Sequence, residues 1–211
     1  MKHSFKSLVL FMSSLTVSVL SGSLAFANTE LGVLGGLNLG MNSFSTTAPG
    51  VTITTGSVSS FMFGAALHHT LQDSFGIEID ALYQKRGISV TGSGGGVSVT
   101  RNITVNYLTL PVMARFEVVP QYVRLGVGGY ASLAISDVSV GDVSATRAAS
   151  NWSSTDFGLI GSVRGSYPVA PNVDLVADVR YMFGFTDVDT TAENDSKLRD
   201  FSILAGASYR F

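Results

Sequence analysis

The sequence predicts an all-β protein, an eight-stranded antiparallel up-and-down transmembrane β-barrel. Three observations support this prediction. Apolar residues alternate with small or polar residues in eight segments, short and long connections alternate between these segments, and only 13% of the residues are charged while 45% are hydrophobic. Soluble domains carry roughly 25% charged residues. The apolar residues are spread with a period of two rather than gathered in long runs, which is typical of strands.

The first 27 residues have the features of a secretory signal peptide. Two lysines precede an apolar stretch at 8–20, and residues 25–27 read Ala-Phe-Ala, which is a cleavage signal. An N-terminal membrane anchor is the alternative, but the apolar stretch is shorter than the ~20 residues that a spanning helix needs. We therefore expect residues 1–27 to be cleaved and residues 28–211 to form the barrel domain.

The eight segments lie at 30–42, 60–67, 75–84, 107–116, 123–133, 156–167, 173–184 and 199–211. Successive side chains of a strand point to opposite faces, so each segment has an apolar face and a small or polar face. In the first four segments the apolar face includes Leu31, Val33 and Leu37; Phe61 and Phe63; Phe75, Ile77 and Ile79; and Leu108, Leu110 and Val112. In the last four it includes Val123, Leu125 and Val127; Phe157, Leu159 and Val163; Val173, Leu175 and Val179; and Phe201, Ile203 and Tyr209. Pro111 has no amide hydrogen for a central strand, so we expect a local bulge there.

The connections between the segments alternate in length. The short ones are 70–74, 117–121 and 168–172, and the long ones are 43–57, 87–102, 137–154 and 186–198, which are rich in Ser, Thr, Gly and Asp. Outer-membrane barrels combine short periplasmic turns with longer extracellular loops. We therefore expect four long surface loops at one rim, including a flexible glycine-rich loop at 92–96.

The composition of the second face indicates which side meets lipid. This face is mostly Gly, Ser and Asn, and beyond residue 27 the chain has only two lysines, Lys85 and Lys197. A water-exposed exterior would carry many more charges. Aromatic residues near the segment ends resemble the girdles at the two membrane interfaces. We therefore expect the apolar face to contact lipid, and the sheet must close because lipid cannot satisfy an open strand edge.

The chain from residue 28 resembles the small Gram-negative outer-membrane β-barrel families, which include the OmpA-like, OmpX-like and PorT-like barrels. The segments that carry the resemblance are ALYQKRG (81–87), NYLTLPVMARFE (106–117), VRLGVGGYASLA (123–134), DVRYMFGF (178–185) and GASYRF (206–211). The resemblance implies a multi-pass protein of the cell outer membrane. It also implies that Tyr209 and Phe211 form the C-terminal signal for the barrel assembly machinery, and that outer-membrane lipids and lipopolysaccharide are partners.

The small or polar face also carries eight charged residues that we expect to form a structural ion-pair network in the lumen: Glu78, Asp80, Arg115, Arg124, Arg164, Asp174, Asp178 and Arg180. A charged pore lining is the alternative. The narrow interior of eight strands leaves room for little besides side chains, which favours the network. Arginine suits it because its planar guanidinium pairs with carboxylates bidentately and stays charged. The sequence therefore predicts a structural or interaction barrel with a plugged lumen, with a small-solute pore as the alternative.

Other residues that resemble chemical sites have simpler explanations. His68 and His69 could serve a lipid-modifying enzyme, but they lie beside a short turn, and alternation sends them to opposite faces. The acidic residues of 186–197 match no EF-hand spacing. The chain has no cysteine and no basic stripe. We therefore expect no catalytic residue, cofactor, metal site or nucleic-acid partner.

Overall fold

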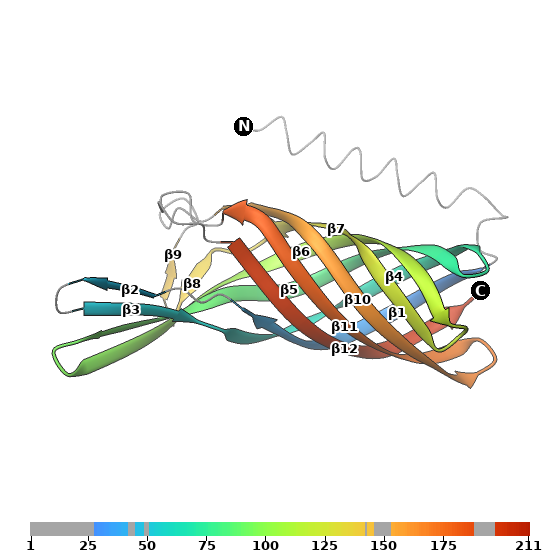
Figure 1. Cartoon of the computed structure of the whole chain (residues 1–211), viewed down its shortest axis with the longest axis horizontal. Coiled ribbons are helices and arrows are strands. Elements are labelled where there is room, and N and C mark those ends of the chain that lie inside the picture. Colours follow the sequence, from blue (N-terminus) through green and yellow to red (C-terminus); the bar gives the residue numbers. More distant parts are fainter. Residues whose placement is uncertain (1–27, 42–44, 49–50, 142, 146–152, 188–196) are drawn as a thin grey trace, which may run out of the picture.

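The barrel wall is a closed ring of eight strands (Figure 1). The computed structural model describes residues 28–41, 45–48, 51–141, 143–145, 153–187 and 197–211, and the expected signal peptide lies outside these residues. The strands of the ring are β1 (Thr29–Gly40), β4 (Val58–Gln72), β5 (Phe75–Gly94), β6 (Val97–Val119), β7 (Val123–Ala134), β10 (Thr155–Ala170), β11 (Val173–Asp187) and β12 (Lys197–Arg210). In the described part of the chain, no helix is long and apolar enough to cross a membrane.

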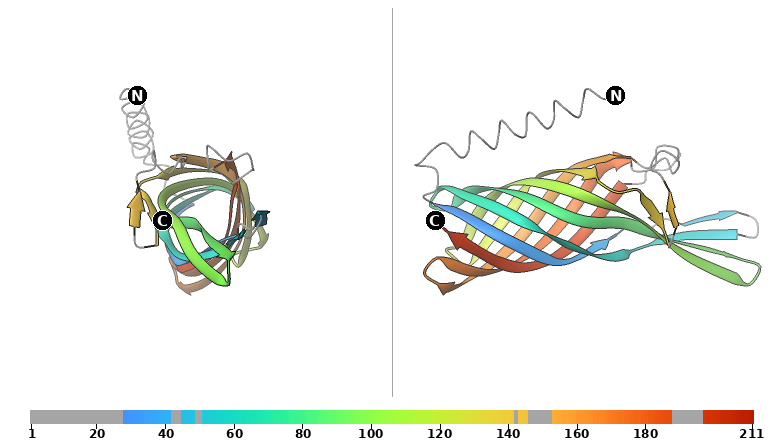
Figure 2. Two further views of the ribbon diagram at one scale, coloured as in Figure 1. Left: turned by 90° about the vertical axis from the view of Figure 1, so that its left-hand side faces the viewer. Right: turned by 180° about the vertical axis from the view of Figure 1, so that it is seen from behind.

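Each ring strand pairs antiparallel with the next ring strand along the chain, and the first ring strand pairs with the last. β1 lies against β12 from Glu30 opposite Arg210 to Gly40 opposite Asp200, which closes the sheet. The end-on view in Figure 2 shows this closed ring. The predicted fold class and strand number are therefore confirmed, and the eight predicted segments coincide with the ring strands, except that the first extends past Gly40 and the last past Arg210.

The two faces of the wall differ as the alternation predicts. Side chains of the apolar face are exposed on the outside, as Phe61 is at 74%, whereas the adjacent Met62 is buried at 1%. Aromatic rings on the outside contact one another near both rims, with ring centroids 5.1 Å apart for Phe75 and Phe116 and 5.0 Å apart for Phe63 and Tyr83. A wall with exposed apolar side chains is stable where its surroundings are lipid.

One rim consists of tight turns and also holds the C-terminus (Figure 1). The turns after β4, β6 and β10 span two or three residues, which is shorter than the predicted connections. Each turn is preceded by a shift in strand register, at Thr70/Gln72, Glu117/Val119 and Pro168/Ala170. Gln121 adopts a left-handed conformation with φ of 68°, which reverses the chain between β6 and β7. We call this end of the barrel the short-turn rim.

The opposite rim carries β-structure where the sequence analysis expected irregular loops. β5 and β6 continue past the ring and pair up to Gly94 opposite Val97, so residues 87–102 form a projecting hairpin (Figure 1). Gly95 and Gly96 turn it with positive φ angles, which glycine adopts without strain. Two small hairpins join its edges: β2 (Ser45–Ala48) with β3 (Val51–Gly56), and β8 (Val138–Val140) with β9 (Val143–Ala145). The prediction of a loop at 92–96 is therefore wrong for residues 92–94, which belong to β5, and the turn consists of Gly95 and Gly96. Alternating Ser, Thr, Val and Ile residues extend the two strands.

Pro111 does not produce the expected bulge. β6 keeps one register against β7 across this residue, with Leu110 opposite Ala131 and Val112 opposite Gly129. Its register against β5 is also unchanged, because Ile79 opposite Val112 and Leu82 opposite Thr109 belong to the same frame. The β5–β6 ladder is therefore interrupted beside the proline, where residues 80 and 81 of β5 have no partner in β6. β6 contains no extra residue at this point.

Glycines on the inner face make room for the large side chains of the lumen. A Cβ atom on Gly126 would lie 2.8 Å from Nη1 of Arg115, and one on Gly158 would lie 2.7 Å from Cε1 of Tyr130. Both positions face inward, where eight strands leave little space. These two glycines therefore complement the bulky Arg115 and Tyr130 side chains of the neighbouring strands.

Candidate functional site: the lumen and its mouth

The lumen is crossed by a central cluster of three carboxylates and three guanidinium groups. Its members are Glu78 and Asp80 on β5, Arg115 on β6, Arg164 on β10, and Asp178 and Arg180 on β11. All six side chains are at most 3% exposed. Their formal charges cancel, which satisfies the condition that buried charges be paired.

Two carboxylates of the central cluster, those of Glu78 and Asp178, accept several charge-assisted hydrogen bonds each. Glu78 accepts from Arg115 Nη2 at 2.6 Å and from Arg164 Nη1 at 2.5 Å. Asp178 accepts from Arg115, Arg164 and Arg180 at 2.8 to 2.9 Å. Arg180 also pairs with Asp80. β5 and β11 are four strands apart in a ring of eight, so these bonds join opposite walls of the barrel.

A second cluster lies nearer the projecting hairpin and centres on Arg86. Its guanidinium donates to Asp156 at 2.6 Å and to Asp200 at 2.5 Å. It also lies 5.5 Å from the ring centroids of Tyr107 and Tyr130, and the Tyr130 hydroxyl donates to Asp156 at 2.9 Å. Arg86 is therefore held by charge, hydrogen bonds and cation–π contacts together.

An apolar layer separates the two clusters. Leu82 lies between Asp80 and Arg86 along β5, and Ile160 lies between Arg164 and Asp156 along β10. Both belong to a cluster of buried side chains that pack together, in which Val176 alone precedes Asp178 along β11: Leu34, Met62, Ala66, Leu82, Met113, Tyr130, Ile160, Val176, Met182 and Leu204. The sequence predicted an inner face of mostly small or polar residues, and this apolar layer departs from that prediction. Alternation showed which face these residues occupy, but it did not show that they pack into one layer.

The third group of charges lies toward the short-turn rim. Arg124 on β7 donates to both carboxylate oxygens of Glu30 on β1, at 2.7 and 2.8 Å, and to Glu117 at 2.9 Å. β1 and β7 are also four strands apart, so this pair again spans the bore. Asp174 pairs instead with Arg210 at 3.0 Å, where Arg210 is 37% exposed.

The eight predicted network residues therefore divide into two sets. Six of them meet in the central cluster, while Arg124 and Asp174 lie nearer the rim with partners outside the predicted set. The partner carboxylates Glu30, Asp156 and Asp200 were not predicted. The alternation of their strands places all three on the inner face, and this signal could have identified them.

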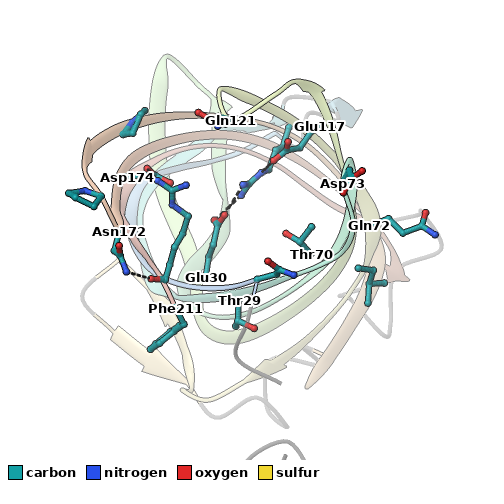
Figure 3. Close-up of a pocket in the computed structure, with 16 residues that line it drawn as sticks. Thr29, Glu30, Thr70, Gln72, Asp73, Glu117, Gln121, Asn172, Asp174 and Phe211 are labelled. Atoms are coloured by element: carbon teal, nitrogen blue, oxygen red, sulfur yellow. Dashed lines mark hydrogen bonds and ion pairs between the residues drawn. The ribbon is translucent and has the colours of Figure 1, made fainter. Parts of the chain in front are cut away.

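A polar cavity of about 600 Å³ lies at the short-turn rim, between the Glu30–Arg124 pair and the end of the barrel (Figure 3). Glu30, Glu117 and Asp174 line it with Thr70 and Gln121. Figure 3 shows Glu30 reaching from the wall into this cavity, with a dashed line to its arginine partner. Water and small solutes can enter this mouth, and the Glu30–Arg124 pair forms its floor.

Four other predicted positions lie around this same rim. His68 is buried with its Nε2 3.3 Å from the Thr70 hydroxyl, whereas His69 contacts the Thr29 hydroxyl at 2.9 Å. Tyr209 and Phe211 are exposed on the outside, with ring centroids 5.2 Å apart. Most of the acidic segment, residues 188–196, lies outside the described residues.

Comparison with solved structures finds the same fold in small outer-membrane barrels. OprG from Pseudomonas aeruginosa is 15% identical, with a TM-score of 0.53 over 88% of this chain and 96% of that one. Neisserial surface protein A is 18% identical, with a TM-score of 0.51 over 88% and 98%. The outer membrane protease OmpT from Escherichia coli is 10% identical, with a TM-score of 0.50 over 87% and 97%. One of these barrels is a protease, so the likeness shows the fold and not an activity.

A search of curated protein sequences found no match. The family model for the outer membrane protein beta-barrel domain matches residues 23–190, which is most of the chain. This match places the protein in the outer membrane, and the closed barrel agrees with that location. The chain therefore belongs to the outer membrane protein beta-barrel domain family.

Proposed function

We propose that this protein is a structural and interaction protein of the outer membrane, with a closed lumen and with the β5–β6 hairpin projecting from the cell surface. The observation that carries the proposal is that ion pairs span the bore at separate levels. Arg180 with Asp80 and Arg124 with Glu30 each join strands on opposite walls. A solute passing through would have to separate buried charges, which costs several kcal/mol for each pair broken.

The projecting hairpin supports a role in surface interaction. Hydroxyl pairs stiffen it across the two strands, with Thr91 and Thr100 at 2.9 Å and Ser93 and Ser98 at 3.0 Å. Apolar side chains stand out on it, with Val97 at 65% and Val99 at 50% exposed. A rigid sheet with exposed valines is suited to bind a partner, because little conformational entropy is lost on contact.

A small-solute pore remains the second candidate, and the cavity at the short-turn rim favours it. Conductance in a planar lipid bilayer separates the two candidates. We expect the wild-type barrel to show no steady single-channel current. A large and stable current from the wild type would contradict the closed lumen and favour small-solute transport over the structural role.

The orientation is tested separately on intact cells. We expect an epitope tag inserted after Gly94 to be labelled by antibody from outside and a tag after Gln72 to be labelled only after permeabilisation. The two sites are matched because they lie in the tight turns at the two ends of β5, at opposite rims. Labelling of the Gln72 tag alone would place the hairpin in the periplasm and contradict surface display.

A further inference from the structure

The wall opens on its outer side between β4 and β5, just below the projecting hairpin. The β4–β5 ladder runs up to Met62 opposite Gln84, and β5 next pairs with β3 at Ser89 opposite Gly56. Within the part of the chain that the structure describes, residues 85–88 therefore pair only with β6. The Ser60 hydroxyl donates to the carbonyl oxygen of Lys85 and bridges the break.

A cleft of about 610 Å³ lies over this break. Leu37, Phe61 and Tyr83 form its apolar side, which belongs to the outer surface of the barrel. Tyr83 stacks against Phe63, within the aromatic band that marks this membrane interface. Asn102, Thr104 and Asn106 of β6 form its polar side, toward the projecting hairpin. The cleft is therefore amphipathic, and its polarity runs along the barrel axis.

Lys85 lines the cleft between the apolar and polar sides. It is exposed on the outer face, and it is one of two lysines beyond residue 27. Its ammonium group forms no ion pair with any described residue, and among the described residues no aspartate or glutamate lines the cleft. A cation on the outer face of a membrane barrel is unfavourable unless it lies near the interface, where headgroups can solvate it.

We propose that this cleft binds a phosphorylated glycolipid of the outer leaflet, with the Lys85 ammonium group on the lipid phosphate. The aromatic and aliphatic side receives an acyl chain, and the amide and hydroxyl groups of β6 bind the sugar. Charge complementarity supports this occupant, because the described residues of the cleft present one cation and several neutral donors and include no acid. The inference rests on the proposed orientation, since phosphorylated glycolipids occupy the outer leaflet of the outer membrane.

The test uses the purified full barrel in neutral detergent micelles, so its result does not depend on orientation in the cell. Retention of diphosphorylated lipid A is titrated by native mass spectrometry and compared with retention of chemically dephosphorylated lipid A. We expect the wild type to bind the phosphorylated lipid about tenfold more tightly or better, because a charge-assisted hydrogen bond contributes roughly 1.5–3 kcal/mol and 1.4 kcal/mol is a factor of ten. Millimolar inorganic phosphate should not compete, because the acyl chain contributes to binding.

Substitutions identify the cation. Lys85→Gln should lose the preference for the phosphorylated lipid, Lys85→Arg should keep it, and Lys197→Gln should not change it, since Lys197 lies on β12 outside the cleft. If Lys85→Gln does not fold, Asn106→Leu should lower the affinity for phosphorylated lipid A at least severalfold. Equal retention of the two lipids by the wild type, or full competition by inorganic phosphate, would overturn the proposal. A reversed labelling result on cells would overturn the orientation and, with it, the glycolipid as the occupant in the cell, even if the purified barrel prefers the phosphorylated lipid.

Discussion

Replacing Arg180 by methionine tests whether the central cluster holds the barrel together. The Arg180 side chain is fully buried, and it contacts Asp178 at 2.8 Å, Glu78 at 3.4 Å and Asp80. Methionine fills a similar length but donates no hydrogen bond. The variant therefore leaves three buried carboxylates with two guanidinium groups, and one negative charge has no partner.

The expected loss follows from the cost of an unpaired buried charge. Removing one partner of a buried ion pair typically costs about 3–5 kcal/mol. In a domain of about this size, 1 kcal/mol shifts the unfolding temperature by roughly 2–4 °C, so we expect a decrease of about 6–20 °C. The decrease is measured by heating the refolded barrel in detergent and following the loss of the folded band on SDS gels run without boiling.

Arg210→Met is the matched control for this variant. Arg210 has a single carboxylate partner, Asp174 at 3.0 Å, and is itself 37% exposed. Asp174 is buried, but both residues line the open cavity at the short-turn rim, where water can solvate the carboxylate once the arginine is removed. We therefore expect a loss of under about 1 kcal/mol, so the unfolding temperature of the variant should stay within a few degrees of the wild type. The double variant Arg180→Met/Asp80→Leu should recover part of the loss. An Arg180→Met barrel as stable as the Arg210→Met barrel would mean that water already solvates the lumen charges, and the closed-lumen reasoning would fail.

Two further predictions concern the wall. The folded protein should fractionate with the outer membrane and migrate differently on SDS gels before and after boiling, because a closed sheet resists the detergent; identical migration together with recovery from the soluble periplasm would contradict membrane insertion. Gly126→Val should lower the unfolding temperature, because its Cβ would lie 2.6 Å from the Ser162 hydroxyl and 2.8 Å from Arg115, and overpacking costs about 1–3 kcal/mol. Gly161→Val is its control, since nothing lies within 4 Å of that Cβ, and equal losses in the two variants would refute the packing argument.

The fold could be predicted from the sequence because alternation assigns every strand residue to a face. A slip of one residue would move all the apolar side chains of a strand inward, so the pattern determines the wall almost alone. The inner charges were found in the same way, since each lies on the small or polar face of its strand. The closed ring then follows from the lipid environment, which does not tolerate an open edge.

The partners within the lumen could not be predicted in the same way. Arg124 and Glu30 are 94 residues apart in sequence and lie on opposite walls, so their contact depends on strand stagger and on the reach of both side chains. The periodicity of the sequence indicates neither the strand stagger nor the reach of the side chains. A balance of four positive and four negative charges suggested one network, whereas the structure divides those charges between a central cluster and the rim.

The projecting hairpin was missed for a different reason. Its Ser, Thr and Gly content is typical of loops, and the expected connection at 87–102 followed from composition. The same stretch contains alternating β-branched residues, which favour strands. Pairing with β3 on one edge and β8 on the other extends a two-stranded ribbon that would be marginal alone.

The layered lumen has a consequence for the choice between a closed barrel and a pore. An opening at Arg124 would connect the polar cavity only with the central cluster, because the apolar layer around Leu82 and Ile160 lies beyond that cluster. A continuous water path would have to break the central pairs, hydrate the apolar layer and separate Arg86 from Asp156 and Asp200. These steps involve different residues, so no single side-chain movement opens the bore. A pore would therefore require a change in the wall itself, whereas the proposed surface role uses the barrel as it stands.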